Sequence, residues 1–259
     1  WINWPCSDNT KDGLIMGGAE AVLKPNTNPN TVNGIVLNPM QQSEPSKQGL
    51  FTNADYAWNI WSDADHYTQV WNDSFAYIDH GTGKETAGSN AYRELSKHMK
   101  NSKQIGNSES EELSPKLDAF KAKLTGNQTI TDEDIAEIRA EFEKLRDAAR
   151  TYREETGNKR TLSQIIYWID AWDDTTSAVL GYLDALSALN HGESTAAVWD
   201  HFASAQNAKT QAGTHGFHYV DHTEYAKAGR IHITPFMNAL DSALSARILP
   251  LIDPNLDTA

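Results

Sequence analysis

The sequence predicts a mainly α-helical protein in which a bundle of helices follows a smaller α/β segment. Apolar residues recur at helical spacing through most of residues 111–250. Near the N-terminus, the apolar run Gly34–Leu37 stops at Asn38-Pro39 and precedes a helix-compatible stretch, Ser43–Trp58. This is the order of a buried strand, a loop and a helix. Residues 81–110 are rich in Gly, Ser, Asn and Lys, which is typical of a boundary between domains.

The helix signals in residues 111–250 indicate where helices begin and which faces they bury. After Thr161, apolar residues from Leu162 to Leu186 are separated alternately by three and four positions, which predicts antiparallel packing. We expect about four or five helices with short loops and a mostly up-down topology. Pro250 and Pro254 are expected to end the last helix, and Ala91–Lys100 to form a short helix before the bundle. Residue types that start helices occur at Ser114-Pro115, Thr131, Thr161 with Gln164, Ser194 and Thr234-Pro235. The apolar face expected after Thr131 comprises Ile135, Ile138, Phe142, Leu145, Ala149 and Tyr152.

The composition excludes several classes of partner. The chain has 259 residues, a formal net charge of −13 and an isoelectric point near 5.0. An acidic surface repels phosphate groups, so neither nucleic acid nor an anionic membrane is an expected partner. No apolar run reaches the roughly 20 residues of a membrane span. The single Cys6 cannot form an intrachain disulfide, and the chain carries no phosphate-binding glycine loop, so no cofactor is expected.

The pair Asp173-Asp174 is a candidate for acid–base chemistry, because two carboxylates can share the work of glycoside hydrolysis. Both residues fall within the long helix expected after Thr161. Adjacent helical residues point about 100° apart and cannot converge on one substrate. A solvated helix face is therefore the favoured interpretation of this pair.

The stretch HGFHYVDH contains His215, His218, Asp221 and His222. In a helix, His218 and His222 would share a face beside Asp221, which is a spacing that suits zinc. Gly213 and Gly216 instead indicate a loop, so an ordinary connection between helices is favoured and a structural metal is the alternative.

Short amide and carboxylate side chains gather in the N-terminal segment. Asn3, Asp8 and Asn38 are expected in loops, and Trp1 stands close to the first two in the sequence. Such side chains can bind hydroxyl groups, and a tryptophan can form an apolar wall beside them. The composition is that of a sugar pocket, although capping of loops by Asn and Asp explains it equally well.

Three sequence motifs in this segment carry a family resemblance. They are W-x-N-W-P-x-x-D from Trp1 to Asp8, N-P-M at Asn38 followed by E-x-S-K, and A-D-Y-x-W-N ending at Asn59. In this order and spacing the sequence resembles family 84 glycoside hydrolases. These are bacterial β-N-acetylglucosaminidases related to O-GlcNAcase, and some are described as hyaluronidases. The resemblance is strong over residues 1–60 and looser over residues 85–250.

The resemblance implies a division of the chain. Residues 1–80 would be the C-terminal portion of a catalytic (β/α)8 barrel, with its site at the C-terminal ends of the strands. WINWP would follow the seventh strand, and GIVLNPM would be the eighth strand with its loop. Residues 81–110 would be a linker with a short helix, residues 111–250 a helical bundle, and residues 251–259 a tail.

The resemblance also implies roles for individual residues. Trp1 would form the wall of the pocket for the N-acetyl group, and Asn3 would lie beside it. Asp8 would bind the O4 and O6 hydroxyls of the sugar, and Asn38 a further hydroxyl. Trp1, Asn3, Asp8 and Asn38 are thus the expected substrate-binding residues, without a metal or other cofactor.

In the family, the N-acetyl oxygen of the substrate attacks the anomeric carbon to form an oxazoline, and two adjacent aspartates assist. Those aspartates end an early strand of the barrel, which would precede Trp1. Asp173-Asp174 lies too late in the chain to be that pair. We therefore expect no catalytic residue in this chain, which would be inactive alone and would need the N-terminal barrel part as its partner.

The resemblance places such an enzyme outside the cell or at the bacterial cell surface and leaves the natural GlcNAc conjugate open. A second hypothesis assigns the chain to a different class, a non-catalytic helical docking module of a larger secreted glycosidase. Aromatic residues on the helices, such as Trp168 and Trp199, would serve that role if they were exposed.

Overall fold

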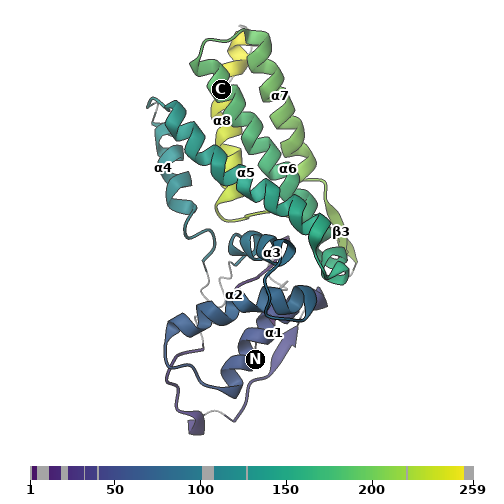
Figure 1. Ribbon diagram of the computed structural model, residues 1–259. Helices are drawn as coiled ribbons and strands as arrows, with labels where there is room; N and C mark the ends of the chain where they lie inside the picture. The colour runs from purple at the N-terminus through teal and green to yellow at the C-terminus, as the bar shows by residue number, and fades with distance from the viewer. Residues whose placement is uncertain are drawn as a thin grey trace.

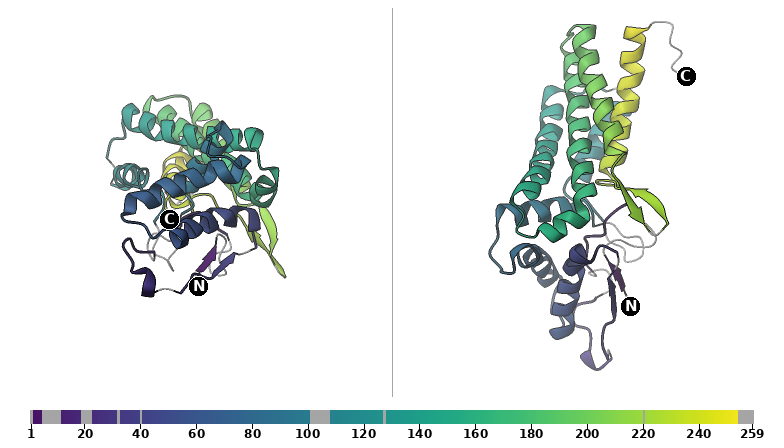
Figure 2. Two further views of the ribbon diagram at one scale, coloured as in Figure 1. Left: turned by 60° about the horizontal axis from the view of Figure 1, so that its bottom comes forward. Right: turned by 90° about the vertical axis from the view of Figure 1, so that its right-hand side faces the viewer.

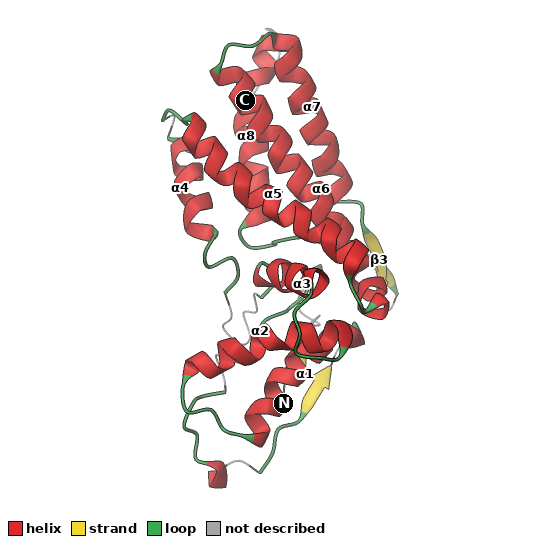
Figure 3. Cartoon of the chain, in the orientation of Figure 1, coloured by secondary structure: helices red, strands yellow, loops and turns green. Residues whose placement is uncertain are grey.

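The computed structural model describes residues 2–4, 12–18, 23–31, 33–39, 41–100, 108–126, 128–219 and 221–253. Helices dominate these residues (Figure 3), which confirms the prediction of a mainly α-helical fold. In chain order, the elements are β1 (Ile2–Trp4), a short 3-10 helix (Pro29–Thr31), β2 (Leu37–Pro39), α1 (Ser43–Trp58), α2 (Ala64–His80), α3 (Ala87–Lys97), α4 (Ser114–Thr125), α5 (Asp132–Glu155), α6 (Lys159–Asn190), α7 (Thr195–Ala212), β3 (Gly216–Tyr219), β4 (His222–Tyr225) and α8 (Ile233–Ile252). Within the described ranges, no helix is both long enough and apolar enough to cross a bilayer.

The elements form two connected groups (Figure 1). The strands β1 and β2 lie with α1 and α2 at one end of the molecule, and α4–α8 form the bundle at the other. Between them lies α3, which packs on both α2 and α5. A Cβ on Gly88 of α3 would lie 2.8 Å from the carbonyl oxygen of Glu155, so a glycine is what allows α3 to approach the end of α5 so closely. The division of the chain into separate domains stays a prediction.

The bundle has the predicted topology. Successive helices from α4 to α8 run in alternating directions (Figure 1), and α6 packs against α5, α7 and α8. The predicted face of α5 is fully buried, and so are the seam positions of α6 from Ile165 to Leu186, whereas Leu162 is half-buried. Thr131 and Ser194 cap α5 and α7 as expected, each accepting a hydrogen bond from a backbone N–H in the first turn.

Several predicted helix ends were wrong. Asn158, not Thr161, caps α6, and its side-chain oxygen accepts a hydrogen bond from the Thr161 amide at 3.0 Å. Ser114 lies inside α4. Pro250 does not end α8 but lies exposed inside its last turn, and the helix continues to Ile252. The short helix before the bundle begins at Ala87 rather than Ala91, because Thr86 and Ser89 form a capping box.

The connection between α7 and α8 is not the plain loop that its glycines indicate. It contains an antiparallel hairpin in which β3 pairs with β4 (Figure 2, right). Phe217 and Tyr219 alternate with other residues, which is a strand pattern, and β-forming aromatics favour the pairing. Phe217 packs on α6, with its ring 4.7 Å from that of Trp168, so the bundle fixes the hairpin at its base.

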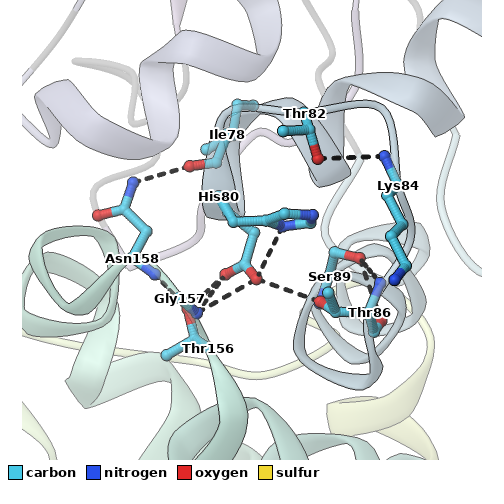
Figure 4. Close-up of polar contacts among 10 residues, drawn as sticks. Ile78, His80, Thr82, Lys84, Thr86, Ser89, Thr156, Gly157 and Asn158 are labelled. Carbon is cyan, nitrogen blue, oxygen red and sulfur yellow. Dashed lines mark hydrogen bonds and ion pairs between the residues drawn. The ribbon is translucent and has the colours of Figure 1, made fainter.

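The buried carboxylate of Asp79 joins α2, α3 and the turn between α5 and α6 (Figure 4). It accepts hydrogen bonds from the Thr156 hydroxyl at 2.5 Å and from the Gly157 amide at 3.1 Å. The Thr86 hydroxyl donates to it at 3.4 Å, and Nδ1 of His80 lies 3.6 Å away. Asp79 lies on α2, and its donors belong to the start of α3 and to the turn between α5 and α6, so this carboxylate holds the two ends of the molecule together.

Replacing Asp79 with alanine would leave the Thr156 hydroxyl and the Gly157 amide without their acceptor in the interior. We expect Asp79→Ala to lower the free energy of unfolding by about 2–4 kcal/mol, measured by urea titration with circular dichroism. The matched control is Asp73→Ala, because Asp73 is an exposed aspartate on the same helix. Equal losses in the two variants would contradict this role of Asp79.

A second carboxylate joins three helices inside the bundle. On α8, Asp241 accepts hydrogen bonds from the Tyr182 hydroxyl at 2.9 Å and the Gln206 amide at 3.2 Å, and it pairs with the Lys209 ammonium at 2.6 Å. Burial disfavours the charged carboxylate, but the hydrogen bonds from Lys209, Gln206 and Tyr182 outweigh it and hold the pKa of Asp241 below its ordinary value.

A depressed pKa in the folded state means that Asp241 stabilises the fold above the unfolded pKa, near 3.8. This contribution is lost as the pH falls through the lower, folded-state pKa. We therefore expect the difference in Tm between the unmodified chain and Asp241→Asn to be largest near neutral pH and to shrink below about pH 3.5. Thermal scans across this range measure it, with exposed Asp200→Asn as control. A difference independent of pH would contradict the assignment.

Candidate functional site

The candidate site is built on two neighbouring strands. β1 pairs with β2 in parallel, and the register sets Asn3 opposite Asn38. These two expected substrate-binding residues, far apart in the sequence, are therefore neighbours across the pair. The other two, Trp1 and Asp8, lie outside the described residues.

The predicted local structure of this site needs correction. Asn3 and Asn38 lie on strands, not in loops, and the second strand covers Leu37–Pro39 rather than Gly34–Leu37. The apolar run before Leu37 is not a buried strand, since Val36 is 63% exposed. Pairing with β1, which apolar periodicity does not reveal, decides where β2 lies.

Asp12, the first described residue after β1, is held by the helical bundle. The backbone carbonyl oxygen of Asp12 accepts hydrogen bonds from the indole Nε1 of Trp168 at 3.0 Å and from the Lys227 amide at 2.8 Å. Its carboxylate pairs with the Lys227 ammonium at 2.8 Å and with the Arg230 guanidinium at 3.5 Å. Asp12 therefore contacts both α6 and the connection that leads into α8.

Beyond Asp12 the chain enters the interior. Leu14, Ile15 and Met16 are buried. The backbone of Met16 donates to the Met99 carbonyl at 2.8 Å and accepts from the Trp71 indole at 2.8 Å. Hydrogen bonds at Asp12 and Met16 thus attach the stretch 12–18 to the surrounding helices.

The helix that follows β2 is held by α6. The side chain of Gln164 accepts a hydrogen bond from the Glu44 amide at 2.8 Å and donates one to the Ser43 hydroxyl at 3.2 Å, so it caps the start of α1. Glu44 is buried; its hydrogen bond from Lys47, supported by Asn158, lowers its pKa although burial opposes this. The sequence indicated Gln164 as part of a capping box for its own helix, but it caps another.

The hairpin contacts the residue that leads from β2 into α1. The Gln41 side chain, three residues after Asn38, donates a hydrogen bond to the backbone oxygen of His218 on β3 at 3.2 Å. Asp12 and Gln41 are the first described residues after β1 and β2, and both contact the stretch from β3 to the start of α8.

The aspartate pair of the long helix has other partners. Asp173 accepts a hydrogen bond from the Arg150 guanidinium at 3.0 Å, and Asp174 lies 2.7 Å from Nε2 of His215. Both carboxylates are partly exposed and lie on α6, so the interpretation as a helix face is confirmed.

The histidine-rich stretch does not form the helical face that a zinc site would use. His218 pairs with Thr223 and Tyr219 pairs with His222, so strand geometry sets His218 and His222 on opposite faces of the hairpin. Hydrogen bonds from His222 to Asp221 and Glu224 raise the pKa of His222. Across the described ranges, no three His, Cys, Asp or Glu side chains are grouped to hold a metal ion.

The aromatic residues considered for glycan binding are mostly unavailable. Trp168 is completely buried, and Trp199 is partly buried and packed against the core. Trp58, at the end of α1, is 94% exposed instead. No local motif marks Asp12, Gln41, Lys227 and Arg230, because their partners are distant in the sequence.

Comparisons with known proteins agree with this architecture. Residues 1–97 match the model of the family described as β-N-acetylglucosaminidase. The solved structure of CpGH84D is 28% identical, covers 95% of this chain and 40% of its own length, and has a TM-score of 0.82. This chain therefore spans well under half of that protein.

Two further solved structures share the fold. CpGH84B is 19% identical with a TM-score of 0.69, and the alignment covers 92% of this chain and 38% of CpGH84B. A mutant of the O-GlcNAc hydrolase of Thermobaculum terrenum is 16% identical with a TM-score of 0.69, over 98% of this chain and 50% of that one.

The family match over residues 1–97 and the fold shared over nearly the whole chain confirm the resemblance drawn from the motifs: this chain is similar to the mainly helical C-terminal region of family 84 proteins.

Proposed function

We propose that this chain is the C-terminal portion of a retaining exo-β-N-acetylglucosaminidase. In this proposal Trp1, Asn3, Asp8 and Asn38 bind the N-acetyl group and the hydroxyls of a terminal GlcNAc. The preceding barrel part contributes the aspartate pair that assists oxazoline formation and protonates the leaving group. The enzyme would work outside a bacterial cell or at its surface.

The observation that carries this proposal is the parallel pairing of Asn3 with Asn38. Both strands run in the same direction, so their C-terminal ends meet at one edge, which is where barrel enzymes build their sites. Amide groups from neighbouring strands can act on one sugar ring, since each amide both donates and accepts hydrogen bonds.

The same pair of strands supports a partner for this chain. β1 and β2 have three residues each, and in the described ranges they pair only with each other. Parallel sheets normally need more strands and a cover on both faces. Further βα units of a barrel would provide the missing neighbours.

In this proposal, the substrate-binding residues of this chain give no catalysis by themselves. Contacts made equally to the ground state and the transition state contribute affinity without accelerating the reaction. Asp173 and Asp174 cannot substitute for the family's pair, because they hold Arg150 and His215 on the bundle. The alternative, a docking module, loses Trp168 as a binding surface because this side chain is buried.

We expect the chain alone to hydrolyse 4-nitrophenyl β-N-acetylglucosaminide no faster than buffer. Adding the barrel part, separately or in one polypeptide, should produce hydrolysis, followed by the release of nitrophenol. Gel filtration of the two parts tests their association directly. Turnover by the isolated chain would overturn the proposal, and association without hydrolysis would favour the docking module.

In the assembled enzyme, Asn38→Ala should reduce kcat/KM by about tenfold, which corresponds to roughly 1.4 kcal/mol and one lost hydrogen bond to substrate. Asn33→Ala is the matched control, because Asn33 is an exposed asparagine that precedes the same strand. Steady-state kinetics of the two variants decide the matter: equal kcat/KM values would remove Asn38 from the site.

A further inference from the structure

We propose that Gln164 of α6 is a positioning residue for Asn38 and that the helical bundle fixes β2 through the start of α1. Gln164 contacts α1, so its effect on the reaction passes through the strand on which α1 packs. This inference rests on the proposed function, in which Asn38 binds a hydroxyl of the sugar.

The first argument is that α6 supplies the N-terminal cap of α1. The residue at the N-cap position of α1, Gln42, makes no capping hydrogen bond with its side chain. Instead, Oε1 of Gln164 accepts from the Glu44 amide at 2.8 Å, and Nε2 of Gln164 donates to the Ser43 hydroxyl at 3.2 Å. Amides in the first turn of a helix have no partner within that helix. The first turn of α1 therefore takes its cap from a side chain of the bundle.

The second argument is that another side chain joins the starts of the same two helices. Asn158 caps α6 through Oδ1, which accepts from the Thr161 amide at 3.0 Å, and its Nδ2 donates to the Glu44 carboxylate at 3.4 Å. The Glu44 carboxylate is buried and also pairs with the Lys47 ammonium at 2.6 Å. Two side chains from the start of α6, Asn158 and Gln164, therefore hold the same turn of α1.

The third argument is that α1 passes its position on to β2. α1 packs on both β2 and α6, and Asn38 is the central residue of β2. In the part of the chain that the structure describes, the only strand that pairs with β2 is β1, which has three residues as well. So short a pair depends on its covering helix for its place in the molecule. A misplacement of about 1 Å can reduce a rate by up to about a hundredfold, so even a partial shift of Asn38 is measurable.

The test removes the polar atoms of Gln164 but keeps the length of its side chain, in the variant Gln164→Met. The matched control is Gln206→Met, because Gln206 is also half-buried and its side-chain amide also joins two helices, donating to Asp241 of α8 at 3.2 Å. Gln206 lies on α7 of the bundle, whereas α1 lies at the other end of the molecule (Figure 1). Each variant is also combined with Asn38→Ala, and thermal scans establish that all of them are folded at the assay temperature.

The measurement is a double-mutant cycle on kcat/KM for 4-nitrophenyl β-N-acetylglucosaminide in the assembled enzyme. Asn38→Ala should cost about tenfold, and we expect Gln164→Met to cost about threefold. Because Gln164 acts through Asn38, the double variant should lose about tenfold, as Asn38→Ala does alone, whereas independent effects would multiply to about thirtyfold. Gln206→Met should leave kcat/KM unchanged in both backgrounds. A merely structural role of Gln164 would lower Tm without this coupling to Asn38.

The outcomes separate this inference from the proposed function. An unchanged kcat/KM in Gln164→Met, or a thirtyfold loss in the double variant, overturns the role of Gln164. If the unmodified enzyme does not hydrolyse the substrate, or if Asn38→Ala has no effect, the proposed function or its assignment of Asn38 fails instead. Hydrogen exchange in the chain alone then decides whether Gln164 positions β2. Faster exchange of the amides of β2 and the first turn of α1 in Gln164→Met than in Gln206→Met supports it, and equal exchange overturns it.

Discussion

The structure depends on the burial of the N-terminal half of α6, where Trp168 and Trp172 are both completely buried. Burying two indoles stabilises the fold by several kcal/mol, and it also requires a partner for each ring N–H. Trp168 finds its partner in the backbone of Asp12, and Trp172 lies against the sulfur of Met99. The requirement to satisfy buried polar groups on this helix therefore fixes the backbone at Asp12 and the side chain of Met99, whose carbonyl in turn accepts from Met16.

The periodic parts of this fold follow from the sequence, and the junctions do not. The faces of α5 and α6 could be predicted because a helix that buries one side must repeat its apolar residues every three or four positions. The place of β2 could not, because it depends on β1, which is distant in the sequence. The cap at Asn158 and the hairpin at Gly216–Tyr225 have local partners, but Thr161 with Gln164 and the glycines of the connection indicated other local structures. Gln164 illustrates the difficulty, since its residue type indicated a local cap and its actual partner is α1.

The candidate site shows the same contrast. The motifs around Trp1, Asn3 and Asn38 marked the residues through family resemblance, and composition alone did not separate a sugar pocket from ordinary loop capping. The structure adds the register that joins Asn3 to Asn38 and the contacts that hold the neighbouring Asp12 and Gln41. The cations that pair with Asp12 are marked by no motif, because the fold brings them together from positions distant in the sequence.

The tight crossing at Gly88 limits where this chain could be divided and its parts exchanged. α3 precedes the bundle in sequence, but its glycine packs directly on the last turn of α5, and Asp79 ties α2 to the turn beyond it. A recombination point placed just before α4 would separate α3 from the end of α5, on which it packs, and would expose the turn between α5 and α6 to water. The unit that can be inherited or transplanted intact is therefore the bundle with α3 attached, and a graft onto a foreign N-terminal segment must also supply a carboxylate where Asp79 stands.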